Sequence, residues 1–110
     1  MHQLPVLSLL AILSACSAKL MVPTQADADR GTAKFPGVTL AQLTDGKKLY
    51  EDNCGTCHAL INPKSESEKE WREMVPLMSA KVNKKAGSEV LDAKKQELIL
   101  QYVLVMHEAK

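Results

Sequence analysis

Residues 53–63 read NCGTCHALINP, in which Cys54 and Cys57 are separated by two residues and His58 follows directly. A C-x-x-C-H stretch suits four kinds of site: a disulfide, half of a zinc site, a dithiol redox centre or a covalent haem attachment. The choice among them decides the fold, because a small domain can depend on the group that such a motif holds.

The composition indicates a small domain that needs additional stabilisation. The chain has 110 residues, enough for one small domain, and its formal net charge is +1. This charge gives no general attraction to nucleic acid or to an acidic membrane surface. Aromatic side chains, which usually supply much of a buried core, are scarce. They are Phe35, Tyr50, Trp71 and Tyr102. Such a domain usually depends on disulfides, a metal or a bound cofactor.

The third cysteine, Cys16, ends a segment typical of export signals. Residues 4–13 form an apolar run that is shorter than the roughly 20 residues needed to span a bilayer. Residues 13–16, LSAC, look like a bacterial lipobox, although no Lys or Arg precedes the apolar run. We expect residues 1–15 to be a signal peptide and Cys16 to be lipidated, which predicts an exported protein anchored on the periplasmic side of a membrane. The alternative is an ordinary signal peptide with a chance cysteine near its end.

Residues 16–37 are expected to hold the lipidated cysteine and a flexible tether. After Cys16 the stretch mixes small, polar and charged residues with two prolines and shows no sustained period. A stretch of this kind would let a folded domain stand off a membrane. The folded domain is therefore expected over residues 38–110.

Three segments of this domain have the apolar spacing of helices. They cover residues 39–50, 68–82 and 89–107. Pro76 should break or kink the second helix, residues 83–87 read as a polar connection, and Ser88 can cap the third helix. A glycine inside a helix costs about 1 kcal/mol relative to alanine, so Gly46 predicts the close approach of another helix. The expected fold class is all-α, with three to four short helices.

Three interpretations of the cysteine pair fit the chain poorly. A structural zinc site needs four ligands, and outside the motif the domain offers only His107. A thioredoxin-type dithiol lies at the start of a helix beside a parallel sheet, whereas a helical segment precedes Cys54. A disulfide between Cys54 and Cys57 would close so small a loop that it would stabilise little.

Covalent haem attachment accounts for all three residues of the motif. Thioether bonds from Cys54 and Cys57 would fix the porphyrin edge, and His58 would supply the proximal nitrogen to the iron. One large apolar cofactor would also replace the missing aromatic core. We therefore expect one covalently bound haem c.

The motif and its surroundings resemble the class I c-type cytochromes, the small monohaem cytochromes c. Gly46, Tyr50 and the C-x-x-C-H residues have the spacing with which that family begins, and Leu98 and Tyr102 resemble the residues that cross Gly46 and Tyr50. The resemblance covers about residues 38–110. It implies the cytochrome c fold, in which N- and C-terminal helices pack near a right angle beside the haem.

The sixth ligand of the iron is expected to be a methionine, since a thioether raises the reduction potential. Met78 is the preferred candidate because Trp71, Val75 and Met78 match a Trp-x-x-x-Val-x-x-Met arrangement in similar small cytochromes. Met74 is the alternative, and Met78 would then only fill core space. A bis-histidine haem through His107 is a further option. The indole of Trp71 is expected either to bind a haem propionate or to pack in the core.

These residues predict a protein that carries single electrons between periplasmic or membrane redox partners and is not an enzyme. A basic group of lysines could steer an acidic partner, or could be a solvated face without one. It consists of Lys81, Lys84, Lys85, Lys94 and Lys95. Two alternatives stay open: a haem-based protein that binds or senses a gas at an open sixth position, and a small electron-relay subunit of a larger oxidoreductase. No nucleic-acid partner is expected.

Overall fold

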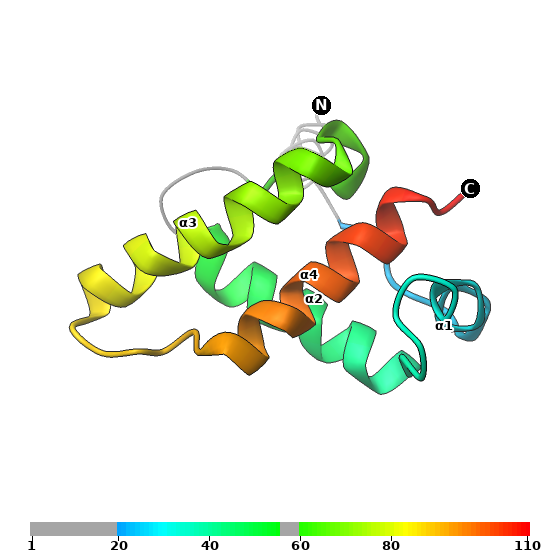
Figure 1. Cartoon of the computed structure of the whole chain (residues 1–110), viewed down its shortest axis with the longest axis horizontal. Coiled ribbons are helices and arrows are strands. Elements are labelled where there is room, and N and C mark those ends of the chain that lie inside the picture. The colour runs from blue at the N-terminus through cyan, green and yellow to red at the C-terminus, as the bar shows by residue number, and fades with distance from the viewer. Residues whose placement is uncertain (1–19, 56–59) are drawn as a thin grey trace, which may run out of the picture.

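The structure is a computed structural model that describes residues 20–55 and 60–110 (Figure 1). Four α-helices and one 3₁₀ helix occur in these ranges, and the described residues contain no strand, which confirms the all-α class. Within the same ranges, no helix is both long enough and apolar enough to cross a membrane. The elements are α1 (Gln25–Gly31), α2 (Leu40–Cys54), η2 (Pro63–Ser65), α3 (Glu68–Ala86) and α4 (Ala93–His107).

Side chains that accept from backbone N–H groups set the start of each α-helix. Thr39 begins α2 and Ser67 begins α3, each in a reciprocal capping box with the residue three positions later. Asp92 caps α4 by accepting from the amide of Lys95. The last helix therefore begins later than the sequence predicted, and Ser88 does not cap it.

Helix α3 runs through Pro76 without the predicted break, and it continues to Ala86, so residues 83–86 are not a connection. A proline in a helix interior costs about 3 kcal/mol because it lacks the N–H group. The opposing contribution comes from burial of Trp71 and Val75 on the inner face of the helix. Gly87, with φ of 75°, ends α3 in the left-handed conformation that glycine adopts without strain.

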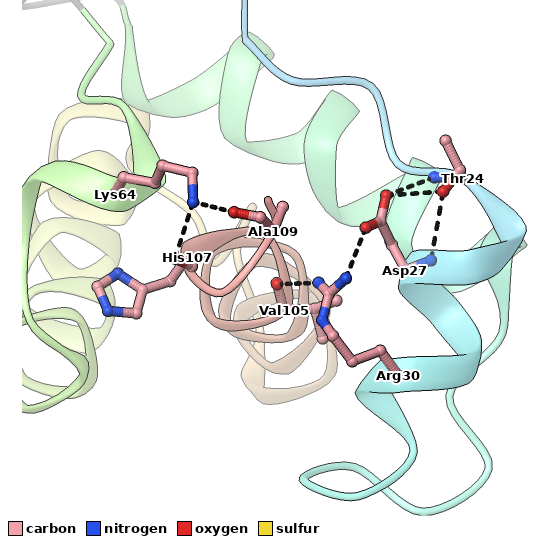
Figure 2. A network of polar contacts seen from close by, with 7 residues as sticks. All are labelled: Thr24, Asp27, Arg30, Lys64, Val105, His107 and Ala109. Carbon is pink, nitrogen blue, oxygen red and sulfur yellow. Dashed lines mark hydrogen bonds and ion pairs between the residues drawn. The ribbon is translucent and has the colours of Figure 1, made fainter.

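The expectation of a flexible tether is wrong for the part of it that the structure describes. Residues 20–37 pack on the domain and contain α1, which a capping box between Thr24 and Asp27 begins. Arg30 links Asp27 to the carbonyl oxygen of Val105 on α4 (Figure 2). A helix of seven residues is too short to show a period in the sequence. Cys16 and the predicted signal peptide lie outside the described residues.

Helices α2 and α4 cross in close contact, with α3 beside α4 (Figure 1). A Cβ atom built on Gly46 would lie 2.1 Å from the carbonyl oxygen of Leu98 and 3.0 Å from Cβ of Tyr102. Only glycine allows the two backbones to come this close. The predicted reason for Gly46 is therefore confirmed, as is its pairing with Leu98 and Tyr102.

The core lies where α4 meets the other helices. Tyr50 on α2 stands between Trp71 on α3 and Tyr102 on α4, with ring centroids 5.9 Å and 6.3 Å away. Three of the four aromatic rings of the chain are thus concentrated at one point, and the pair with Trp71 has the favourable edge-to-face geometry. This cluster adjoins the residues that precede and follow the C-x-x-C-H motif.

Candidate functional site

An apolar cavity of about 100 Å³ lies between the end of α2, the segment after the motif, α3 and α4. Its walls are almost entirely carbon and sulfur, so it offers little to a polar ligand. An apolar group that entered this space would gain contacts with the carbon and sulfur atoms of its walls. The lining residues are Tyr50, Cys54, Ile61, Trp71, Met74, Val75, Met78, Ser79 and Ile99.

The hydroxyl of Tyr50 fixes the chain just after the motif. It accepts from the amide of Ile61 at 3.0 Å and donates to the carbonyl oxygen of the same residue at 2.8 Å. The ring is only 4% exposed, and burial raises the pKa of Tyr50 to about 12. Because Cys54 lies one turn after Tyr50 on α2, both the entry to the motif and the exit from it are held at the cavity.

Of the three motif residues expected to hold the haem, Cys54 is the one that the structure describes. Its half-buried thiol lines the cavity, and burial raises the pKa of Cys54 to about 11. At neutral pH this sulfur is almost entirely in the thiol form. Reactive dithiol centres instead need a lowered thiol pKa, so the environment of Cys54 disfavours that chemistry. Cys57 and His58 lie outside the described residues.

Both candidate methionines line the same cavity. Met74 and Met78 are one turn apart on α3, where the helix presents them to the side on which Cys54 lies. Both are half-buried, and Met74 also packs against the hydrophobic core. The continuous course of α3 through Pro76 is what allows both thioethers to face one cavity.

Trp71 packs in the core, which is one of its two expected roles, and its indole N–H already has a partner in the protein. Its Nε1–H donates to the carbonyl oxygen of Pro63 at 2.9 Å. The same oxygen lies 3.0 Å from Nδ1 of His107, so the end of α4 is fastened to η2. His107 is therefore outside the cavity lining, which disfavours the bis-histidine alternative.

The five lysines of the basic group are exposed and lie near the connection between α3 and α4. They belong to the last turns of α3 and the first turn of α4, at the end of α4 remote from α1. The acidic residues of 66–73 are partly compensated, since Glu68 binds Lys34 and Arg72.

Several wall residues escaped the sequence reasoning. Ser79 and Ile99 are buried, but a serine or isoleucine on a helix face carries no sign of a cavity. Ile61 lies eleven residues after Tyr50, and no sequence pattern indicates that the two residues meet at the cavity. The spacing of Trp71, Val75 and Ser79 by four residues was a usable signal for the inner face of α3.

The described residues contain no group of three or more His, Cys, Asp or Glu side chains that could hold a metal ion. Comparisons with protein-family models, with characterised proteins and with solved structures gave no significant match to this chain.

Proposed function

We propose that this protein is a monohaem c-type cytochrome that carries single electrons and is anchored by a lipid at Cys16 on the periplasmic side of a bacterial membrane. The observation that carries the proposal is the shared cavity: the thiol of Cys54 and the thioethers of Met74 and Met78 line one apolar space. The attachment point at the end of α2 and two candidate iron ligands on α3 therefore border the same space.

The donor set fits a haem better than it fits the competing groups. Cys54 and Cys57 would hold the porphyrin edge by thioether bonds, His58 would bind the iron on one side, and Met78 would bind it on the other. The apolar walls favour a flat, largely apolar group. A porphyrin is larger than the cavity, so its attachment requires α3 to move away from α2 and Ile61, or the ring to extend beyond the cavity.

The chain's own residues have three tasks in this proposal. Tyr50 holds the segment after the motif against α2, Val75 and Ile99 supply apolar wall, and a thioether from α3 would bind the iron opposite His58. Bound haem supplies a one-electron couple between ferric and ferrous iron. With His58 and a methionine as its ligands, a bound iron would have no position open to substrate, which is why we propose a carrier rather than an enzyme.

The choice between Met78 and Met74 can be tested with a matched pair of variants. In the ferric holoprotein we expect the weak near-infrared band of methionine-bound iron, with loss of the band in Met78→Ala and its retention in Met74→Ala. The two substitutions remove the same side chain one helical turn apart, so a general loss of packing should affect both. Loss of the band in Met74→Ala alone would assign the ligand to Met74.

The same material separates electron transfer from gas binding. An open sixth position predicts high-spin iron that binds carbon monoxide rapidly in the unaltered protein. That result would contradict the proposed carrier and support the sensor. Salt-sensitive co-purification with a larger oxidoreductase would instead identify the chain as a relay subunit.

A further inference from the structure

The packed part of the chain begins very close to the proposed lipid anchor. Leu20 is 9% exposed and belongs to the hydrophobic core, and the next residue is held through its backbone. The hydroxyl of Tyr102, in the interior of α4, donates to the carbonyl oxygen of Met21 at 2.7 Å. Only three residues, 17–19, separate Cys16 from this fixed point.

Polar contacts hold the following residues on α4 (Figure 2). Asp27 accepts from the backbone and the hydroxyl of Thr24, and its carboxylate binds Arg30 at 2.8 Å. Arg30 also donates to the carbonyl oxygen of Val105 at 2.6 Å, near the C-terminal end of α4, where a cation is favourable. Burial acts to raise the pKa of Asp27, but the contacts with Arg30 and Thr24 outweigh it and lower the pKa. The ion pair therefore persists at neutral pH.

From these contacts we infer that the face around Val22 rests on the lipid surface. This inference depends on the lipidation of Cys16 in the proposed function. Four residue steps of fully extended chain span at most about 14 Å, and the headgroup layer is itself about 5–8 Å deep. A free tether to Val38 would instead have 22 steps and a typical reach of about 25 Å. The short link therefore holds the domain against the headgroups.

Val22 is the side chain that this arrangement brings to the membrane. It is 71% exposed although apolar, and it lies two residues beyond Leu20. With a link of this length, we expect the exposed side chain of Val22 to contact the lipid headgroups and the edge of the acyl region. The formal net charge of +1 gives the protein no general attraction to anionic lipid, so the length of the link enforces the contact.

The same constraint orients the rest of the molecule. Helix α1 packs at the C-terminal part of α4, while the α3–α4 connection leads into the N-terminus of α4, at the opposite end of the long axis (Figure 1). The five lysines and Val90 lie at this connection, away from the blue start of the described chain in Figure 1, so we expect them to remain in water. A water-soluble redox partner would approach there.

The test uses the lipidated holoprotein in vesicles of a neutral phosphatidylcholine. Val22→Cys and Val90→Cys each add one thiol, since Cys16 is acylated and both motif cysteines are bound to haem in that form. A bulky water-soluble maleimide then reports access. We expect labelling at position 22 to be at least fivefold slower on vesicles than in a Cys16→Ser form, which has neither the lipid nor a thiol at position 16, and labelling at position 90 to be unchanged.

A second variant changes only the length of the link. Ten Gly and Ser residues inserted between Ala18 and Lys19 should restore rapid labelling at position 22 on vesicles. Equal rates at positions 22 and 90 in the lipidated protein, or protection that survives the insertion, would overturn the inference. If mass spectrometry shows no lipid on Cys16, the anchoring fails and this inference fails with it; a lipidated protein with an unprotected position 22 overturns this inference alone.

Discussion

Gly46 is the residue on which the crossing of α2 and α4 depends. A Cβ atom at this position would lie 2.1 Å from the Leu98 carbonyl oxygen, which belongs to a helix backbone and cannot rotate away. We expect Gly46→Ala to lower the free energy of unfolding by about 2 kcal/mol or more, because overpacking outweighs the gain of about 1 kcal/mol in helix propensity. Chemical denaturation of both proteins measures this difference.

Gly87→Ala is the matched control for that substitution. Gly87 has φ of 75°, and nothing lies within 4 Å of a Cβ atom built on it. The change should cost about 1 kcal/mol from backbone conformation alone. A Gly46→Ala protein as stable as the Gly87→Ala protein would contradict the close crossing.

The raised pKa of Tyr50 predicts that the free energy of unfolding falls at alkaline pH. Its folded pKa of about 12 lies above the ordinary value of 10.0, so the neutral hydroxyl stabilises the folded state fully below pH 10. This contribution is lost as the pH rises through 12. Tyr50→Phe should cost about 1–3 kcal/mol at pH 7, because both backbone groups of Ile61 lose their partner. Unfolding measured at pH 8, 10 and 11 should then show a shallower alkaline decline in the variant.

Burial also raises the pKa of Tyr102, so Tyr50→Phe should keep part of the alkaline decline. Identical pH dependence in the two proteins would show that Tyr50 is solvated, contrary to the contacts with Ile61. The sequence predicted the role of Gly46 correctly, because a glycine inside a helix has few explanations other than the close approach of another chain segment. It gave no sign of the hydroxyl contact between Tyr50 and Ile61, because an eleven-residue separation becomes a contact only through the fold.

Among the elements, α3 shows how tertiary packing changes a local expectation. Local propensity predicted a break or kink at Pro76 and a connection from residue 83. Trp71 and Val75 hold the helix on its inner face, and Gly87 ends it only after the lysines. The continuous helix puts Met74 and Met78 on one wall, so this difference bears directly on the proposed ligand.

Asn83 closes the link between α3 and α4. Its Oδ1 accepts from the amide of Leu91 at 2.8 Å, and its Nδ2 donates to the carbonyl oxygen of Leu91 at 3.1 Å. Leu91 is fully buried. We expect Asn83→Ala to cost about 1–3 kcal/mol, since the buried amide of Leu91 is left without its acceptor. Thermal or chemical unfolding measures this loss.

Asn83→Asp separates the two contacts. Aspartate keeps the acceptor for the Leu91 amide, and the Leu91 carbonyl oxygen still accepts from Gln96 at 2.9 Å. The variant should therefore lose less stability than Asn83→Ala. Equal losses in both variants would mean that the amide contact contributes little.

Helix α1 could not be predicted from a period of apolar residues, because polar contacts attach it to α4. The capping box of Thr24 and Asp27 was readable in principle as a Thr followed three residues later by an acid. The contact of Arg30 with Val105 spans 75 residues, and no local pattern announces it. The prediction of a flexible tether was wrong for this reason. Because residues 20–37 are packed, the link to the proposed anchor is shorter than predicted.

For the whole molecule, the scarcity of aromatic residues and the cavity support the same proposal. Tyr50 and Trp71 line the cavity, Tyr102 packs against Tyr50, and the other lining side chains are mainly sulfur-bearing and aliphatic. A cofactor in this position would join α2, α3 and α4. We expect protein made without haem attachment to lose most of its helical circular dichroism at 37 °C. A fully helical apoprotein with a cooperative transition above that temperature would contradict a cofactor-dependent core.

The central claim is the covalent attachment of one haem at Cys54 and Cys57. The most direct measurement is the intact mass, under denaturing conditions, of protein made in a host that attaches haem c. The account predicts the mass of the mature polypeptide with its lipid plus one haem, and loss of that stable attachment in Cys54→Ala and Cys57→Ala. A polypeptide without the haem mass, or one lighter by two hydrogens as a Cys54–Cys57 disulfide would make it, would contradict the account.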